Sequence, residues 1–134
     1  EGFSIKILPL ICYEIIYSGK IFTNPNFDLI INISEDGWFG NSIGPKQHFT
    51  HSIFRAIESG KYLLRSANNG IAAIINPLGI VEQKVEYGKS GYVDFKEAKK
   101  IQPTLFAKYG NKIFITLILL YIFIIFSFNR IKNE

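Results

Sequence analysis

The length of 134 residues suits about one domain, and a hydrophobic share of 48% is enough for a packed core, which excludes a disordered chain. A single cysteine excludes an intramolecular disulfide. The formal net charge is +4, and residues 91–134 supply all of it, with seven Lys and Arg against three Asp and Glu. Because these basic residues flank an apolar segment and are not interleaved with aromatic residues, they favour a membrane surface over nucleic acid as a partner. For the cluster Lys96–Lys100, an ordinary solvated charge run is the alternative.

The first predicted element is a buried strand over Ile5–Ile11, an apolar run rich in β-branched residues in which Pro9 is the one irregularity. Cys12, the only cysteine, follows the run directly, and Glu14 comes two residues later. A nucleophile at the carboxyl end of a buried strand is exposed while its backbone stays fixed, which suits covalent catalysis. A small buried hydrophobic role for Cys12 is the alternative. The chain opens directly into this strand without a methionine, so we expect the carboxyl-terminal piece of a longer protein.

A second buried strand is predicted over Phe27–Ser34, because the segment is nearly continuous in apolar residues. It runs into a polar loop punctuated by glycine, Glu35–Gly44. The carboxyl ends of parallel strands meet at one edge of an α/β sheet. We therefore expect the two strands to be neighbours at the centre of the sheet, with Cys12 near this loop.

A helix is predicted over Pro45–Gly60, since proline is favoured at the first helical position. His48 and His51 lie on roughly the same side of this helix, so a metal site or a catalytic pair with the cysteine is conceivable. No further cysteine or clustered carboxylate completes a ligand set, and we expect neither a metal nor a cofactor. Arg55 and Glu58, on the same helix, are interpreted as structural partners of each other.

Strands and turns alternate after the helix. Asn68-Asn69-Gly70 is a strong turn signal, and Pro77-Leu78-Gly79 is a second one. The segment Ile80–Tyr87 alternates between its two faces, with Glu82, Lys84 and Glu86 on one of them, as a half-exposed strand does. The predicted strands are Tyr62–Ala67, Ile71–Asn76, Ile80–Tyr87 and Gly91–Phe95.

The segment Ile113–Phe128 is almost purely apolar. Its length is slightly below the roughly 17–25 residues that a membrane-spanning helix needs. Lys112 and Arg130 can extend to the two interfaces and close the gap, so we predict a transmembrane helix. A buried core helix is the alternative, but a helix that is hydrophobic all round is unusual in so small a domain.

Five motifs occur in one order along the chain. They are Ile11-Cys12-Tyr13-Glu14, Asp36-Gly37-Trp38-Phe39-Gly40, Gly44-Pro45-Lys46-Gln47-His48, Arg55-Ala56-Ile57-Glu58 and Arg65-Ser66-Ala67-Asn68-Asn69-Gly70. From about Pro9 to its end, the chain resembles the nitrilase-like domain of the bacterial apolipoprotein N-acyltransferase family. Glu35 is a departure, because the family more often shows asparagine there.

The resemblance implies an α/β fold with four segments. Residues 1–104 correspond to the carboxyl-terminal part of a nitrilase-like catalytic domain, and so to part of an α-β-β-α sandwich. Residues 105–112 correspond to a basic juxtamembrane linker, residues 113–128 to one transmembrane helix and residues 129–134 to a polar tail.

The resemblance also implies the chemistry. In the family, a phospholipid acylates the cysteine to a thioester, and the acyl chain then passes to the α-amino group of a diacylglyceryl-modified cysteine at the amino terminus of a lipoprotein. By position, Cys12 matches the nucleophile and Glu14 matches an acidic residue beside it in the active site. Tyr13, Trp38 and Phe39 are the candidate substrate-binding residues, and a loop anchor packed on the core is the alternative for Trp38. The base glutamate and the lysine of the family's triad lie upstream of this chain.

The implied partners are a phospholipid acyl donor, a diacylglyceryl apolipoprotein acceptor and the membrane bilayer, and a monomer is expected. The implied location is the bacterial inner membrane, multi-pass in the full-length protein, with the catalytic domain on the periplasmic side. Two alternatives stay open. One is a carbon–nitrogen hydrolase of the same fold with water as acceptor, and the other is a non-catalytic membrane-tethered remnant. Without the upstream glutamate and lysine, the fragment alone is expected to be inactive.

Overall fold

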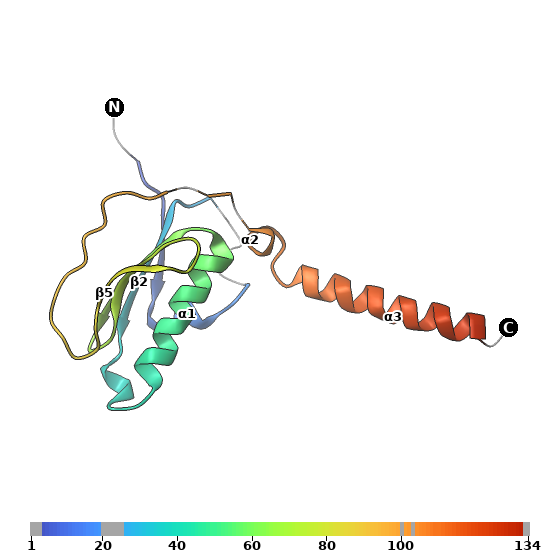
Figure 1. The fold of residues 1–134 in the computed structure, drawn as a ribbon, viewed down its shortest axis with the longest axis horizontal. Coiled ribbons are helices and arrows are strands. Elements are labelled where there is room, and N and C mark those ends of the chain that lie inside the picture. The colour runs from blue at the N-terminus through green and yellow to red at the C-terminus, as the bar shows by residue number, and fades with distance from the viewer. Residues whose placement is uncertain (1–3, 20–25, 100, 103, 133–134) are drawn as a thin grey trace.

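A five-stranded sheet organises the fold (Figure 1). The computed structural model describes residues 4–19, 26–99, 101–102 and 104–132. The strands follow one another across the sheet in chain order, as β1 (Ile7–Ile11), β2 (Leu29–Glu35), β3 (Tyr62–Asn68), β4 (Ala72–Ile75) and β5 (Val81–Val85). The first three strands are parallel, whereas β4 and β5 continue the sheet as antiparallel strands.

The two apolar runs that were predicted to be neighbouring strands do pair with each other. β1 and β2 are parallel, with Ile7 beside Leu29 and Ile11 beside Ile33. The prediction that both are central is wrong for β1, which lies at the edge of the sheet that the described residues form. An apolar run shows that a strand is covered on its faces, but it does not show how many strands lie beyond it.

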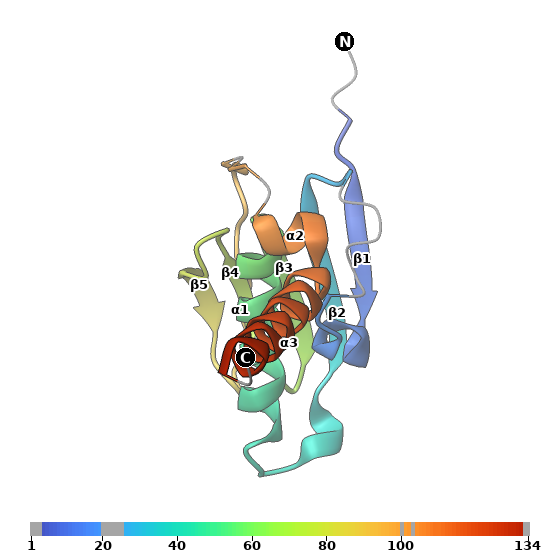
Figure 2. The ribbon, with the colours of Figure 1, turned by 90° about the vertical axis from the view of Figure 1, so that its right-hand side faces the viewer.

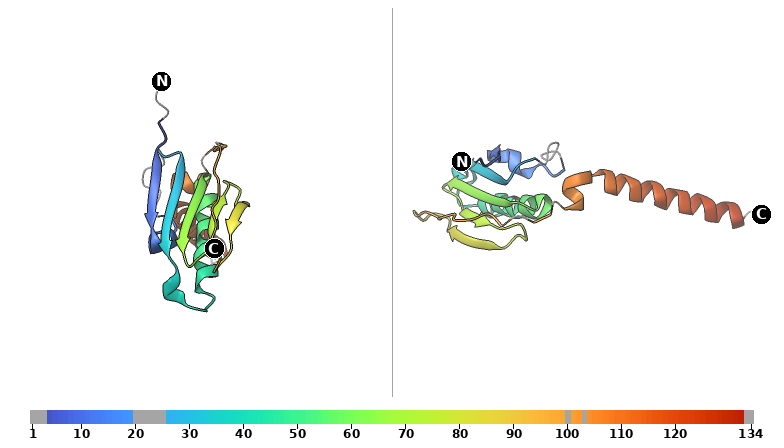
Figure 3. Two further views of the ribbon diagram at one scale, coloured as in Figure 1. Left: turned by 90° about the vertical axis from the view of Figure 1, so that its left-hand side faces the viewer. Right: turned by 90° about the horizontal axis from the view of Figure 1, so that it is seen from above.

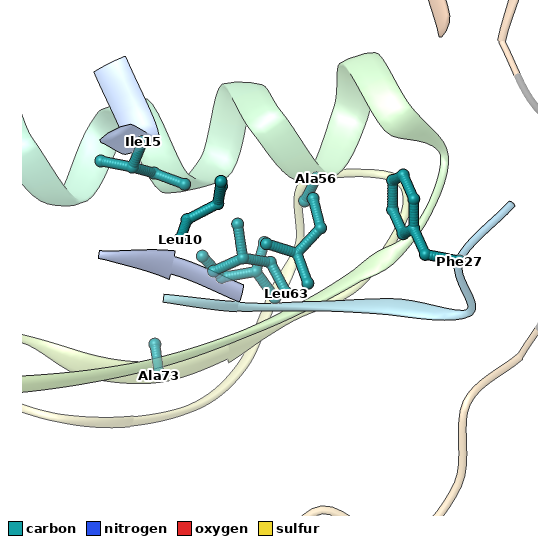
Figure 4. Packing of buried hydrophobic residues seen from close by; sticks show 8 residues of the cluster. Leu10, Ile15, Phe27, Ala56, Leu63 and Ala73 are labelled. Atoms are coloured by element: carbon teal, nitrogen blue, oxygen red, sulfur yellow. The ribbon is translucent and has the colours of Figure 1, made fainter. Parts of the chain in front are cut away.

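Helix α1 (Gly44–Ser59) covers one face of the sheet (Figure 2). Pro45 occupies its first turn, as predicted, and Gly60 ends it in the left-handed region with a φ of 67°. The main core lies between this helix and the sheet (Figure 4). Full burial of one leucine or isoleucine side chain contributes about 1.5–3 kcal/mol, so this cluster is a main source of stability. Its buried members are Leu10, Ile15, Phe27, Ile30, Ala56, Leu63, Ala73 and Ile75.

The segment Gly91–Phe95, predicted to be a strand, is extended but is not one of the strands that the described residues form. Its backbone is satisfied by a side chain, because the Asp94 N–H donates to Gln83 Oε1 at 3.0 Å and Gln83 Nε2 donates to the Asp94 oxygen at 2.9 Å. Val93 and Phe95 pack on the sheet face opposite α1 (Figure 3). This segment therefore contacts the sheet through these two side chains, and the prediction of a strand there is wrong.

Two helices follow, α2 (Leu105–Tyr109) and α3 (Lys112–Lys132). The stretch predicted as a linker thus contains a short helix, which begins where the Thr104 hydroxyl accepts a hydrogen bond from the Ala107 N–H at 3.0 Å. α3 projects away from the sheet (Figure 1). Its stretch Lys112–Arg130 has a mean hydropathy of 2.2 and is 0% buried, which contradicts the alternative of a core helix. By length and composition, α3 could cross a membrane.

An ion pair between Asp36 and Arg65 is buried between α1 and the sheet. Arg65 Nη2 lies 2.8 Å from Asp36 Oδ2, and neither side chain is exposed to solvent. The same guanidinium donates from Nη1 to Asn32 on β2 and, at 3.3 Å, to Ser52 on α1. One side chain from β3 therefore joins three elements of the fold.

Replacing Arg65 with methionine should leave a buried carboxylate without its charged partner and lower the free energy of unfolding by about 3–5 kcal/mol. Urea denaturation of the detergent-solubilised chain measures this. Lys84→Met is the matched control, since Lys84 pairs with Glu86 at 2.5 Å where both side chains are about half exposed. Its expected loss is about 0.5 kcal/mol or less. Equally small losses in the two variants would contradict the importance of the buried pair.

The stability should also depend on acid through Asp36. Burial acts to raise the pKa of Asp36, but hydrogen bonds from His48 and Ser34 and the charge of Arg65 outweigh it and hold that pKa below its usual value. The carboxylate therefore contributes stability above the unfolded-state pKa of about 4, and this contribution is lost as the pH falls through the lower folded-state pKa. The difference in urea midpoint between the native chain and Asp36→Asn should shrink over that range. A constant difference would rule out a titrating Asp36.

Candidate active site

Cys12 occupies a sharp turn between β1 and a 3-10 helix, η1 (Cys12–Ile16). Its φ of 48° lies in the left-handed region, which costs a residue with a β-carbon roughly 1–2 kcal/mol. The thiol is half-buried at the carboxyl edge of the sheet. A strained strand-to-helix turn is a known way to present a nucleophile, so the position fits the role that the sequence predicts.

The carboxylate of Glu14 lies back across this turn. Its Oε2 accepts a hydrogen bond from the Ile11 N–H at 2.6 Å. On the other side, Asn32 Nδ2 donates to the Leu10 oxygen at 3.0 Å and to the Cys12 oxygen at 3.5 Å. Glu14 therefore stabilises the backbone that carries the thiol.

A buried polar cluster lies below the thiol and consists of Ser34, Asp36, His48 and Arg65. The Ser34 hydroxyl oxygen lies 2.7 Å from Asp36 Oδ1 and 3.6 Å from Cys12 Sγ. His48 Nδ1 lies 2.9 Å from Asp36 Oδ1, and His48 Nε2 lies 3.3 Å from the Cys12 carbonyl oxygen. Both ring nitrogens of His48 are engaged with oxygens, so the conceivable pair of cysteine and histidine is a contact with the main chain and not with the sulfur.

His51 lies elsewhere on α1 and is half-buried. Desolvation, with the charges of Arg55 and His48, lowers the pKa of His51. Residues 4–19, 26–99, 101–102 and 104–132 contain no group of three or more side chains that could hold a metal ion.

Three rings line one side of the turn. The ring centroids of Tyr13 and Phe39 are 6.0 Å apart, and His48 lies 5.2 Å from Tyr13 and 5.6 Å from Phe39. Trp38 sits beside Phe39 in the short helix η2 (Gly37–Phe39) and is 87% exposed. The structure thus brings Tyr13 and Phe39 together next to the thiol, and the alternative of Trp38 as an anchor packed on the core is wrong.

Arg55 and Glu58 form the structural pair that was predicted, with Arg55 Nη2 2.8 Å from Glu58 Oε1. Arg55 Nη1 also donates to the Ile16 oxygen at 3.3 Å, and the Ser18 hydroxyl donates to Glu58 Oε1 at 2.9 Å. Burial raises the pKa of Glu58 against the effect of these two partners. The pair fastens the end of η1 to α1 and takes no part in the thiol's surroundings.

Glu35, the departure from the family pattern, organises the loop at the end of β2. Its carboxylate accepts hydrogen bonds from the Gly37 N–H at 2.7 Å and from Asn68 Nδ2. These two bonds lower the pKa of Glu35. A polar cavity of about 370 Å³ adjoins this loop, lined among others by Ser66, Asn68, Asn69 and Lys89.

Asn32, Ser34 and Arg65 were not among the residues predicted for the active site. The available signal was polarity inside apolar strands, since Asn32 interrupts β2 and Arg65 interrupts β3. A polar side chain on a buried strand face needs a partner, so two such residues on neighbouring strands indicate a buried network.

The chain is similar in sequence to known proteins over most of its length. The family described as carbon-nitrogen hydrolase matches residues 2–94. An apolipoprotein N-acyltransferase of Rickettsia bellii (strain RML369-C) is 47% identical over 136 residues, which cover 100% of this chain and 26% of the relative. Proteins of the same name from Rickettsia prowazekii (strain Madrid E) and Wigglesworthia glossinidia brevipalpis are 40% and 43% identical, covering 100% and 81% of this chain and 27% and 22% of the relatives.

The chain therefore spans about a quarter of the length of these relatives. The matched range includes the Cys12 turn, all five strands and α1. The resemblance stated from the motifs is confirmed, and the chain belongs to the carbon-nitrogen hydrolase family.

Proposed function

We propose that this chain carries the nucleophile of an apolipoprotein N-acyltransferase and that Cys12 is that nucleophile. The observation that supports this most directly is a half-buried thiol on a left-handed residue at the sheet edge, with its backbone held from β2 and α1. A free thiol is mostly protonated at neutral pH, so a base must remove its proton. We assign that base, and the lysine that accompanies it in the family, to the part of the protein before Glu1.

The reaction has two steps. The Cys12 thiolate attacks the ester carbonyl of a phospholipid, so that a C–S bond forms and a C–O bond breaks, and the lysophospholipid leaves as an alcohol after taking a proton. The α-amino group of the lipoprotein's diacylglyceryl-cysteine then attacks the thioester. A C–N bond forms, the C–S bond breaks, and the amine's proton goes to the base. Each step passes through an oxyanion that needs cationic or amide donors.

Lipid substrates fit the surroundings of the thiol. The rings of Phe39 and of Tyr13, the residue that follows Cys12, lie together, and Trp38, next to Phe39 in sequence, is exposed to solvent. Tryptophan is favoured at the boundary between a membrane and water. With α3 anchored in the inner membrane and the domain on the periplasmic side, neither substrate needs to leave the bilayer.

The part of the sheet face opposite α1 that stays uncovered fits a larger domain. Ile7, Ile11 and Ile33 are 46%, 57% and 55% exposed, although they lie on adjacent strands in register. Two sheets that pack face to face bury such residues between them. We propose that the upstream part of the protein supplies the second sheet of the α-β-β-α sandwich.

A carbon–nitrogen hydrolase with water as acceptor is the second candidate, and family membership alone supports it equally well. The exposed apolar surface of α3 favours the acyltransferase, because an amidase that acts on dissolved substrates has no use for a membrane helix. The third candidate is a non-catalytic membrane-tethered remnant, which would form no acyl adduct on Cys12.

In the full-length protein, Cys12→Ala should abolish acyl transfer and Cys12→Ser should nearly do so. A covalent intermediate needs a nucleophile, and a serine hydroxyl has a much higher pKa than the thiol for which the base is suited. Mass spectrometry after incubation with phospholipid should show an acyl adduct on Cys12 of the full-length protein and none on the isolated 134-residue chain, which lacks the proposed base. Normal turnover by Cys12→Ala, or an adduct on the isolated chain, would show that the chemistry is misassigned.

Glu14→Gln should slow turnover by about tenfold or more while the fold survives. The amide keeps an oxygen that can accept from the Ile11 N–H, so only the charge beside the thiol is lost. Turnover of the full-length protein and its urea midpoint are the two measurements. Glu86→Gln, at an exposed position on the far side of β5, is the control and should change neither. A normal rate in Glu14→Gln would restrict Glu14 to capping the turn.

Removing α3 should release the isolated 134-residue chain from the membrane. A version that ends before Lys112 loses the whole apolar stretch and should partition into the soluble fraction, whereas the complete chain should sediment with membranes. Fractionation and immunoblotting measure both. Equal solubility of the two versions would exclude α3 as the anchor.

A further inference from the structure

His48 connects the buried charge pair to the nucleophile. The residue is 2% exposed and lies on α1, whereas Cys12 follows β1. Its Nδ1 faces Asp36 Oδ1 at 2.9 Å, and its Nε2 faces the Cys12 carbonyl oxygen at 3.3 Å. Nδ1 also lies 3.2 Å from Arg65 Nη2, so it faces both a carboxylate oxygen and a guanidinium donor, and Nε2 donates to the Cys12 carbonyl when it carries hydrogen.

The carbonyl that His48 contacts belongs to Cys12, whose backbone conformation is strained. Cys12 has a φ of 48°, a conformation that residues with a β-carbon leave unless their surroundings fix it. The direction of the Cys12 carbonyl and the direction of its side chain are set by the same backbone angles. A donor on that carbonyl therefore also sets where Sγ points. Asn32 shares this oxygen only at 3.5 Å, at the limit of a hydrogen bond.

The imidazole of His48 is held by hydrogen-bond partners and by two aromatic rings. Asp36, which orients Nδ1, accepts further hydrogen bonds from Arg65 at 2.8 Å and from Ser34 at 2.7 Å. The rings of Tyr13 and Phe39 lie 5.2 and 5.6 Å from its centroid. A ring held at both nitrogens and packed against two aromatic side chains cannot rotate without breaking several contacts, which suits it to fix a partner.

We propose that His48 is a positioning residue for Cys12: oriented by Asp36, it donates a hydrogen bond from Nε2 to the Cys12 carbonyl and keeps the thiol in the conformation from which it reacts. The inference rests on the proposed role of Cys12 as nucleophile. Its test does not require acyl transfer, because Cys12 is the only thiol in the chain and its alkylation can be measured directly.

Two substitutions at His48 separate the two contacts. In His48→Asn the side-chain amide can replace Nδ1 toward Asp36 but is too short to reach the Cys12 carbonyl. In His48→Gln the amide nitrogen can occupy the place of Nε2 and donate to that carbonyl. The two variants are equally polar but differ by one methylene, so the urea midpoint reports any loss of packing and the alkylation rate reports the contact with the Cys12 carbonyl.

The measurement is the rate of alkylation of Cys12 by iodoacetamide in the detergent-solubilised 134-residue chain, with the urea midpoint recorded for every variant. In the proposed reactive conformation Sγ lies 3.6 Å from the Ser34 hydroxyl, so a thiol that spends part of its time outside this conformation should react more slowly. We expect His48→Asn to react about three- to tenfold more slowly, the effect of one lost hydrogen bond, and His48→Gln to stay within about twofold of the native rate. His51→Asn and His51→Gln, at the half-buried histidine of the same helix, are the controls and should leave the rate unchanged.

Equal alkylation rates in His48→Asn and His48→Gln, or a native rate in a folded His48→Asn, would overturn the inference. If His48→Asn does not fold, the alkylation rate of folded His48→Gln is the test. A native rate supports the inference, and a lowered rate overturns it. Failure of the proposed function is seen separately, as normal acyl transfer by the full-length Cys12→Ala protein.

Discussion

The carboxylate of Asp36 is the group on which the arrangement of the site depends. It is fully buried, and burying a charge costs several kcal/mol unless partners replace its water. Arg65 supplies the opposite charge from β3, while Ser34 and His48 supply hydrogen bonds from β2 and α1. Because each partner comes from a different element, no element can shift without leaving the carboxylate partly unsatisfied. The sheet edge that presents the thiol is fixed in this way.

The hydrophobic pattern predicted most of the strands and the helix well, because periodicity reports burial. The strand expected over Phe27–Ser34 is found as Leu29–Glu35, and the helix expected from Pro45 begins at Gly44. The strand expected over Gly91–Phe95 is not found in the described sheet, because only Val93 and Phe95 pack against it and Asp94 exchanges hydrogen bonds with the side chain of Gln83. A side chain that takes the place of a strand leaves no trace in the alternation of apolar residues.

The candidate nucleophile could be proposed from the sequence, because Cys12 and Glu14 are close together and lie in a recognisable motif. Its supports could not, since His48 lies 36 residues from Cys12 and reaches its main chain, not its side chain. A backbone contact of this kind depends on the left-handed turn at Cys12, and no residue type in the sequence announces that turn, as a glycine would. A pair of cysteine and histidine could therefore be considered from the sequence, but the contact between the His48 ring and the Cys12 carbonyl could not be predicted from it.

One residue of α1 also connects the turn of the nucleophile to the apolar helix. The side chain of Glu58 binds Ser18, just after η1, while its main-chain oxygen accepts a hydrogen bond from the hydroxyl of Thr104. Thr104 in turn caps α2, and α3 begins three residues after α2 ends. If α3 lies in the bilayer as proposed, the turn that carries Cys12 and the base of the membrane helix are fastened to the same end of α1. For the proposed acyltransferase, a fixed height of the thiol above the membrane would matter, since the ester and the amine must both reach one sulfur without leaving the lipid.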